Sequence, residues 1–179
     1  DDFQTIILRP ATICGFSPKM RFDLTVNILT NFAYHKGFIR VFGGNQYRPN
    51  LHIQDMCNLY QTLIFEDWSK FNGEIFNVGF ENLKVIEIAK IIKNFIENKY
   101  QKKVDLKIEE SFDNRSYRLD SEKIIEKFNF KPQYSVISAV EELCSVFENN
   151  TLKDTFDKKF SNIEVLKEKN LKFINRLDI

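Results

Sequence analysis

The run Phe3-Gln-Thr-Ile-Ile-Leu-Arg-Pro-Ala-Thr-Ile-Cys-Gly15 is almost continuously apolar and ends in glycine. This pattern is typical of a strand that is buried on both faces of a parallel sheet. Such a strand needs neighbouring strands and covering helices, so it cannot begin a fold by itself. Because ligands in open α/β sheets bind beyond the carboxyl ends of the strands, we expect a ligand near residues 11–15.

Composition limits the classes of protein that fit the chain. Its 179 residues, 43% of them hydrophobic, suit one globular domain or a large part of one. The formal net charge of +1 comes from basic and acidic residues that are spread without long blocks of one sign, so neither a nucleic acid nor an anionic membrane is indicated as a partner. The chain has no apolar run of membrane-spanning length, and its start, Asp1-Asp2, is unlike a signal peptide, so we expect a cytoplasmic location.

The cysteines and histidines do not indicate a metal or a nucleophilic site. Cys14, Cys57 and Cys144 are far apart and form no C-x-x-C pair, which is typical of reduced, buried thiols. With only His35 and His52 besides, no zinc ligand set and no Cys–His nucleophile pair can be argued. We considered His52 as a general base, but its place in an alternating strand favours a structural role.

The stretch 41–55 predicts a strand, a glycine turn and a second short strand that enters a helix at Asp55. Gly43 and Gly44 can take positive φ angles, which allows a tight turn and a close approach of a ligand to the backbone. Arg48 follows at the lip of this turn, where a planar guanidinium could contact a phosphate through two hydrogen bonds. The alternative is a surface arginine without a ligand.

From Asp23 to His35 the apolar residues recur at helical spacing, and Asp23 is the expected N-cap. A helix N-terminus favours an anion, so a nucleotide diphosphate could lie near Arg21 and the first turn. A capped helix that only packs is the alternative. The same patterns predict the remaining elements: helices at 56–65, 85–100, 120–128 and 137–147, strands at 73–79 and 104–109, and a charged, loosely helical tail at 149–179.

Several blocks resemble one family, the extended short-chain dehydrogenase/reductases that act as NAD-dependent sugar-nucleotide epimerases and dehydratases. Gly43-Gly-Asn-Gln-Tyr-Arg-Pro-Asn-Leu-His-Ile-Gln-Asp55 is similar to the family's G-x-G-x-Q-x-R-[DP]-[FWY]-[IVL]-H-[IV]-x-D block, with Asn50 at the usual aromatic position. Ser17-Pro-Lys-Met-Arg-Phe-Asp-Leu-Thr-Val-Asn27 is similar to S-P-R-[ML]-R-F-D-L-V-V-N. Leu8 to Gly15, Gly73 to Gly79 and Asp113 to Lys123 resemble three further blocks of the family's C-terminal half.

The resemblance implies roles for particular residues. Arg48 and Arg115 would hold the diphosphate of a nucleotide sugar, and Asn77 and Val78 would lie beside its base. Pro10, Ala11 and Thr12 would lie near the nicotinamide, with Thr12 also at the sugar, where many members use asparagine. Asp23, Leu24 and Asn27 of the second block complete the substrate-binding residues that we expect.

The resemblance covers about Gln4 to Phe147, which corresponds only to the second half of a family member. The sequence contains neither the G-x-x-G-x-x-G turn nor the Y-x-x-x-K pair of the first half, so we assign no catalytic residue and no metal ligand. The expected fold class is α/β: the C-terminal part of a Rossmann-like doubly wound parallel sheet plus the small α/β substrate-binding domain. Residues 1–148 would form this half and residues 149–179 a tail.

These expectations lead to one interpretation and one rival. The chain would be the substrate-binding half of an NAD(P)-dependent nucleotide-sugar epimerase, dehydratase or reductase. NAD or NADP would be bound mainly by the absent N-terminal Rossmann half, and the complete enzyme could be a homodimer. The rival is a non-catalytic remnant that binds a nucleotide sugar or a protein.

Overall fold

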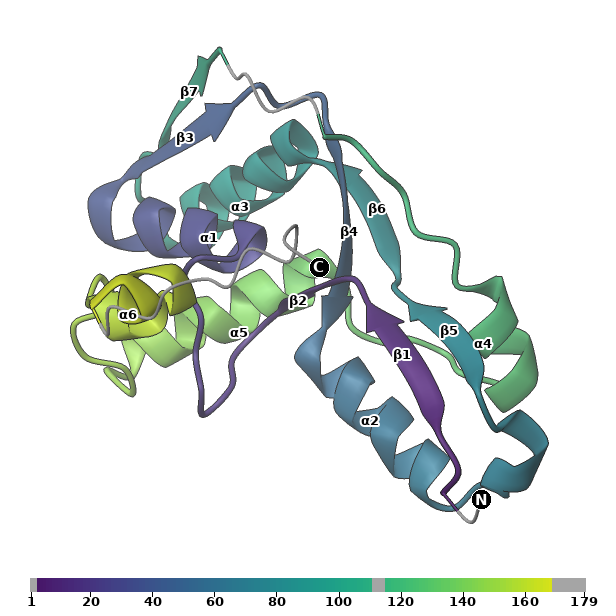
Figure 1. Cartoon of the computed structure of the whole chain (residues 1–179). Helices are drawn as coiled ribbons and strands as arrows, with labels where there is room; N and C mark the ends of the chain where they lie inside the picture. Colours follow the sequence, from purple (N-terminus) through teal and green to yellow (C-terminus); the bar gives the residue numbers. More distant parts are fainter. Residues whose placement is uncertain (1–2, 111–114, 169–179) are drawn as a thin grey trace.

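The computed structural model describes residues 3–110 and 115–168 and has an α/β fold (Figure 1). Its elements, in chain order, are β1 (Ile6–Pro10), β2 (Thr12–Cys14), α1 (Thr25–Lys36), β3 (Phe38–Phe42), β4 (Tyr47–His52), α2 (Ile53–Ile64), the 3₁₀ turn η1 (Trp68–Phe71), β5 (Glu74–Val78), β6 (Glu81–Lys84), α3 (Val85–Tyr100), β7 (Asp105–Glu109), α4 (Glu122–Phe128), α5 (Val136–Glu148), the 3₁₀ turn η2 (Lys158–Phe160) and α6 (Asn162–Glu168).

In the described part of the chain, the strands form three small sheets. β1 pairs with β5 and β3 pairs with β7, both in parallel. The third sheet has the order β2-β4-β6, in which β4 is parallel to β2 and antiparallel to β6. β4 therefore lies in the middle of the molecule, with β1, β5, α2 and α4 on one side and β3, β7, α1, α3 and α5 on the other (Figure 1).

The sequence predicts one strand over residues 3–15. The structure instead has two strands there, and they belong to different sheets. The break follows Pro10, which has no N–H to continue a ladder, and Ala11 donates its N–H to the carbonyl of Val78 at 2.7 Å. Beyond Ala11 the chain crosses to pair with β4. The start and the end of the run thus belong to two neighbouring sheets.

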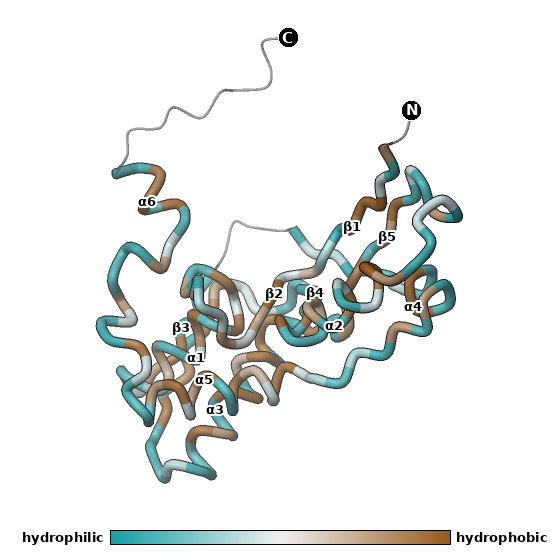
Figure 2. The backbone as a smooth tube through the Cα atoms, turned by 90° about the horizontal axis from the view of Figure 1, so that it is seen from below, coloured by the Kyte–Doolittle hydropathy of each residue, from teal (hydrophilic) through white to brown (hydrophobic). Residues whose placement is uncertain are grey.

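β1 is buried on only one face, which corrects the expectation of burial on both. Its partner positions Leu8 and Phe76 face a core formed with α2 and α4, and Phe76 is fully buried there. On the opposite face Ile7 is 45% exposed and Ile75 is 39% exposed. Figure 2 shows both helices on the same side of β1 and β5. Half of the apolar pattern therefore has no covering layer within the described residues.

A second core lies between α1, α3, α5 and β3. Val85, Ile88, Ile92 and Ile96 recur at helical spacing on α3 and are buried against Ile39. The helix begins and ends where the periodicity predicted, at Val85 and Tyr100. α5, buried on one side at Val136, Val140 and Leu143, also agrees with its prediction to within one residue at each end.

Besides α4, which begins at Glu122 rather than at residue 120, two helix starts differ from the sequence prediction. α1 begins at Thr25 with Leu24 as its N-cap, because the Asp23 carboxylate is bound by the Arg21 side chain instead. α2 begins at Ile53, where His52 is the N-cap and its Nδ1 accepts the N–H of Gln54 at 3.1 Å.

The segment after α5 folds back against α1. Phe22 donates its N–H to the carbonyl of Phe160 at 2.9 Å, and the two rings lie edge to face at 5.4 Å. Farther along α1, the Thr155 hydroxyl and the Asn31 side chain are buried and hydrogen-bonded at 2.7 Å. Residues 152–162 therefore contribute to the packing of the fold, while residues 169–179 of the expected tail lie outside the described range.

The exposed face of β1 generates the first prediction. In a monomeric sample, amide hydrogens of residues 6–10 should exchange faster than those of α3, because β1 has a hydrogen-bonded strand on one edge only within the described residues. Hydrogen exchange followed by mass spectrometry or NMR measures this difference. Equal protection of β1 and α3 would show that the two-stranded sheet is already complete.

Candidate functional site

A cavity of about 480 Å³ lies between α1 and β3. One end is polar, with Asp23 and Thr25 from the start of α1 and Arg48 from β4. The remainder is mainly apolar and aromatic. The complete lining is Asp23, Thr25, Ile28, Leu29, Phe32, Phe38, Arg40, Val41, Phe42, Gln46, Arg48 and Val85. The size suits a small organic ligand.

Alternation along β3 builds one wall of the cavity. Ile39 and Val41 are buried in the core, whereas Phe38, Arg40 and Phe42 share the opposite face, as period-two geometry requires. Phe42 is 52% exposed although it is a large aromatic residue. An exposed aromatic ring in a concave site offers a surface on which a flat ligand can stack.

The glycine turn after β3 sets the position of β4. Gly43 and Gly44 have φ angles of 77° and 105°, as the sequence predicted. Gln46 fastens the turn: its Oε1 accepts the N–H of Gly44 at 2.6 Å and its Nε2 donates to the carbonyl of Phe42 at 2.7 Å. Arg48 consequently lies within β4, one residue after its start, rather than at the lip of the turn.

Arg48 contacts the segment that carries the second predicted arginine. Its Nη1 donates to the carbonyl of Arg115 at 2.5 Å and to that of Tyr47 at 2.9 Å, and its Cζ lies 5.7 Å from the centre of the Tyr117 ring. Two blocks that are 67 residues apart in the sequence thus meet at the polar end of the cavity. Asp113 and Asn114, which begin the second block, lie outside the described residues.

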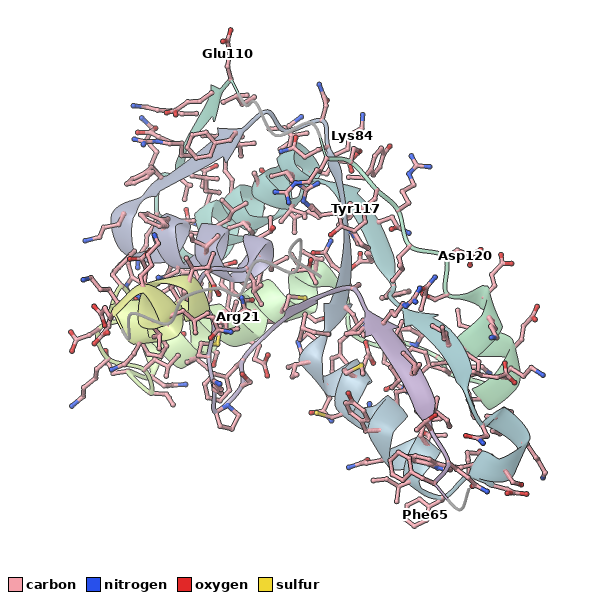
Figure 3. The ribbon with its side chains drawn as sticks, in the orientation of Figure 1. Arg21, Phe65, Lys84, Glu110, Tyr117 and Asp120 are labelled. Carbon is pink, nitrogen blue, oxygen red and sulfur yellow. The ribbon has the colours of Figure 1, made fainter. Side chains whose placement is uncertain are left out.

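The extended segment that holds Arg115 runs beside β4 and β6. Ser116 Oγ accepts the N–H of Tyr47 at 3.0 Å, and the Asn82 side chain bonds both the N–H and the carbonyl of Leu119. Figure 3 shows Tyr117 and Asp120 on this segment and Lys84 at the end of β6. The contacts fix the register of the segment, so its basic residues stay at the same end of β4.

The start of α1 faces the cavity with few internal partners for its backbone. The first intrahelical bond of this turn joins the N–H of Ile28 to the carbonyl of Leu24. Leu24 has no polar side chain for capping, and the first turn contains no acidic residue. The N–H groups of residues 25–27 therefore keep the partial positive charge that attracts an anion to a helix N-terminus.

Asp23 in the cavity lining is an ionised carboxylate whose charge is balanced by Arg21. Arg21 donates to it from Nε at 2.9 Å and from Nη2 at 3.0 Å, and Asn162 donates its N–H at 3.2 Å. Burial works against ionisation of Asp23, but the Arg21 hydrogen bonds and charge outweigh it and hold the pKa below its ordinary value. Figure 3 shows Arg21 on the loop before α1. The pair limits the repulsion that Asp23 would exert on an anion.

Other predicted site residues lie elsewhere. Pro10, Ala11 and Thr12 are at the carboxyl end of β1, where the chain leaves one sheet for the next, and Thr12 is paired with Asn50. Asn77 and Val78 are on β5 in the β1 sheet and do not line the cavity.

Asn27 is buried, and both ends of its amide are used inside the fold. Its Oδ1 accepts the N–H of Gly15 at 3.2 Å, and its Nδ2 donates to the carbonyl of Arg21 at 3.0 Å. In this geometry Asn27 of α1 ties down the first residue of the loop between β2 and α1 and a second point within it.

His52 and Glu142 form a buried polar contact behind the site. The His52 Nε2 lies 3.3 Å from Glu142 Oε2, which also accepts the N–H of Phe16 at 2.8 Å. Gly15 packs against the pair with φ of 97°, and a Cβ there would come within 2.8 Å of His52 Nε2. The Nδ1 of His52 thus accepts the N–H of Gln54, while its Nε2 lies beside the Glu142 carboxylate and makes no hydrogen bond among the described residues.

The thiols near the site are unreactive by position. Burial, together with nearby carboxylates, raises the pKa of Cys14 to about 12, so its thiolate is scarce at neutral pH. Within residues 3–110 and 115–168, no cluster of histidine, cysteine or carboxylate side chains could hold a metal ion. None of the helices described there is both long and apolar enough to cross a bilayer.

The sequence reasoning missed several residues at the cavity. Phe38, Arg40 and Phe42 alternate on β3, and alternation alone does not distinguish a ligand-facing strand from a solvent-facing one. Another aromatic and basic group stands beside Arg48, outside the cavity lining: Arg118 Cζ lies 3.9 Å from the Tyr47 ring centre and Lys84 Nζ lies 5.7 Å from it. The adjacency of tyrosine and arginine in both arginine blocks is the signal that could have indicated this group.

Comparisons with known proteins find a curated relative that is similar to part of the chain. No family model matches the chain. It is 30% identical to CDP-paratose 2-epimerase of Salmonella typhi over 112 residues, which are 61% of this chain and 32% of that protein.

Solved structures show a similar fold. UDP-glucose 4-epimerase of Thermotoga maritima, determined with UDP-glucose, has a TM-score of 0.66 and 21% identity over 83% of this chain and 47% of its own. dTDP-glucose 4,6-dehydratase of Bacillus anthracis, determined with NAD, has a TM-score of 0.65 and 20% identity over 81% of this chain and 44% of its own.

The chain therefore spans about a third of the curated relative and less than half of these solved structures. The neighbours are sugar-nucleotide epimerases and dehydratases, in agreement with the family resemblance, and their structures confirm the Rossmann-like α/β fold class. Coverage of about 45% agrees with the expectation that the chain corresponds to one half of such a protein, the C-terminal one.

The Asp23 contacts generate a prediction about stability and pH. Asp23→Asn should lower the free energy of unfolding at pH 7 by about 1–2 kcal/mol, since the charge-assisted bonds to Arg21 are partly exposed and weakened by solvent. A lowered carboxyl pKa stabilises the fold above its unfolded value, and this contribution is lost as the pH falls through the folded value. The difference between wild type and variant should therefore shrink as the pH falls below 3.8.

Urea denaturation at several pH values measures the effect. Glu110→Gln, at the exposed end of β7 (Figure 3), serves as the control and should change stability by no more than about 0.5 kcal/mol. A difference at Asp23 that stays constant from pH 7 to pH 3 would contradict the assignment.

Proposed function

We infer that this chain is the C-terminal, substrate-binding half of an extended short-chain dehydrogenase/reductase, in which it holds a nucleotide sugar against a nicotinamide cofactor. Three observations support the inference: the family blocks in the sequence, the shared fold of the solved epimerases and dehydratases, and the cavity beside Arg48. The complete enzyme would be an NAD(P)-dependent nucleotide-sugar epimerase, dehydratase or reductase, an isomerase or oxidoreductase of carbohydrate biosynthesis.

The observation that carries the proposal is the meeting of Arg48 and the Arg115 segment opposite the start of α1. A diphosphate between them would receive guanidinium hydrogen bonds from one wall and backbone N–H groups from the other. Each charged contact contributes roughly 1.5–3 kcal/mol when it is partly desolvated. The apolar remainder of the cavity would take the base, which leaves the sugar to extend toward Thr12.

The residues at the end of β1 fit the nicotinamide end of NAD or NADP. Ligands of α/β sheets bind beyond the carboxyl ends of the strands, and Ala11 follows the carboxyl end of β1, where the chain passes from the β1–β5 sheet to the β2–β4–β6 sheet. Gly79 lies so close to Ala11 that a Cβ on the glycine would approach it to 3.2 Å. The nicotinamide would accept a hydride from the sugar, while Thr12 would orient a sugar hydroxyl.

The rest of the cofactor site would come from a partner, the N-terminal Rossmann half. The exposed face of β1 and β5 offers that half an apolar surface through Ile7 and Ile75, and the outer edge of β1 offers it backbone groups for a further parallel strand. A homodimer of the complete enzyme and a cytoplasmic location belong to the same proposal.

The rival function is a non-catalytic module that binds a nucleotide sugar or a protein. It is favoured by the absence of any tyrosine with a lysine four residues later in the 179-residue sequence. Gene sequence upstream of Asp1 distinguishes the two, since an adjoining G-x-x-G-x-x-G and Y-x-x-x-K would support the enzyme.

A substitution at Arg48 tests the diphosphate site. Arg48→Lys should weaken binding of UDP to the 179-residue chain by about tenfold, because lysine keeps the charge but loses the planar fork. Isothermal titration calorimetry measures the affinity. Arg9→Lys, on β1 in the β1–β5 sheet, is the matched control and should bind UDP as wild type does. Equal affinity of the Arg48 variant would reduce Arg48 to a surface charge.

A turnover assay tests the division into halves. The chain alone should convert no nucleotide sugar in the presence of NAD or NADP, because it holds no tyrosine–lysine acid/base pair. Co-expression with an N-terminal Rossmann half should yield a complex and restore turnover. Turnover by the purified chain alone would contradict the assignment, and failure of any such half to bind would favour the rival.

A further inference from the structure

We propose that Arg40 reads the base of the bound nucleotide by donating hydrogen bonds to a base carbonyl oxygen. The ligand would then be a nucleoside diphosphate whose base carries a carbonyl, as uracil, thymine, cytosine and guanine do and adenine does not. This inference rests on the proposed function, because it assumes that the diphosphate lies at Arg48. It adds to that function the part of the ligand that the cavity selects, which is the carbonyl group of the base.

The position of Arg40 on β3 places it between two aromatic residues of the cavity wall. Phe38, Arg40 and Phe42 share one face of the strand, and all three line the cavity. The glycine turn connects this strand directly to β4, which carries Arg48. A diphosphate at Arg48 would therefore direct its nucleoside along this wall.

Stacking by itself would hold any base. Phe42 exposes about half of its side chain, and a flat base over its ring would cover apolar surface. Every base has a π-face, so an aromatic ring does not distinguish one base from another. Selection has to come from a polar group that meets the edge of the base.

Arg40 has the chemistry and the support for that contact. Its Nε lies 3.0 Å from Glu109 Oε1 on the neighbouring strand β7, which restrains the guanidinium. In the described part of the chain, its terminal nitrogens Nη1 and Nη2 have no hydrogen-bond partner. A guanidinium only donates, so it matches a carbonyl oxygen and opposes the exocyclic amino group of adenine.

Binding of UDP, CDP, GDP and ADP to wild type and Arg40→Met tests the inference. Methionine keeps an unbranched apolar stem and removes every donor. Affinity for UDP, CDP and GDP should fall by about tenfold, and affinity for ADP should change by less than about threefold. Arg40→Lys, which keeps a charge and a donor, should restore part of the preference.

Two controls separate base reading from general charge. Lys107→Met removes a positive charge from the position paired with Arg40 on β7, and it should leave the ratio of UDP to ADP affinity unchanged. Inorganic pyrophosphate, which has no base, should bind Arg40→Met as it binds wild type. Retained pyrophosphate binding also shows that the variant is folded.

The outcomes distinguish this inference from the function on which it rests. An equal loss of affinity for all four nucleotides and pyrophosphate would make Arg40 a general anion attractor and overturn the inference. An unchanged affinity for all four would overturn it as well, while Arg48-dependent binding would leave the diphosphate site standing. If wild type bound neither pyrophosphate nor any nucleotide, both would fail.

Discussion

The position of β4 controls both the packing of the fold and the geometry of the cavity. The strand is hydrogen-bonded to β2 on one edge and to β6 on the other, and it is buried from Pro49 to His52. Leu51 packs in the core of α2 and α4, while Cys14 of β2, which is paired with His52, packs in the core of α1, α3 and α5. Arg48 belongs to the same strand, so a shift of β4 large enough to move the guanidinium would disturb both cores. The interior therefore holds the guanidinium in place before a ligand arrives, which reduces the entropy lost on binding.

The charges around the cavity balance in favour of an anion. Asp23 is the acidic residue that lines it, and Arg21 binds this carboxylate through two hydrogen bonds. Arg48, Arg40 with its partner Glu109, and the partial charge of the α1 N-terminus then remain as the field that a ligand meets. A sequence with net charge +1 can in this way create a local anion site without any basic patch that composition would reveal.

Sequence reasoning was most accurate where one periodicity governed a whole element. α3 and α5 were predicted to within a residue because apolar residues recur at helical spacing along each helix and are buried there. The expected cap at Asp23 was wrong because a local partner, Arg21, and a distant one, the N–H of Asn162, bind the carboxylate in place of its own helix. The expected double burial of β1 was wrong for a different reason: an apolar pattern records the surroundings for which a strand is suited, whereas Ile7 has no cover within the described residues. The motifs predicted Arg48 and Arg115 as site residues, and the structure places Arg48 but not Arg115 in the cavity lining. Nothing in the sequence indicated Arg40 and Phe42, because exposed residues at alternating strand positions resemble an ordinary solvent face.

The segment after α5 supports the cavity, although its sequence carries no functional signal. The ring centres of Phe156 and Phe32 lie 5.1 Å apart, edge to face, and those of Phe32 and Phe38 lie 5.4 Å apart. The segment therefore supports Phe32 of the cavity wall directly and Phe38 through Phe32. At the other end of the cavity, the N–H of Asn162 binds Asp23. Because rings in contact transmit displacement through close packing, the segment from Phe156 to Asn162 shapes both the aromatic wall and the acidic rim. Its sequence is charged and weakly patterned since it contributes only a few anchoring residues, and that is why periodicity could not reveal its role.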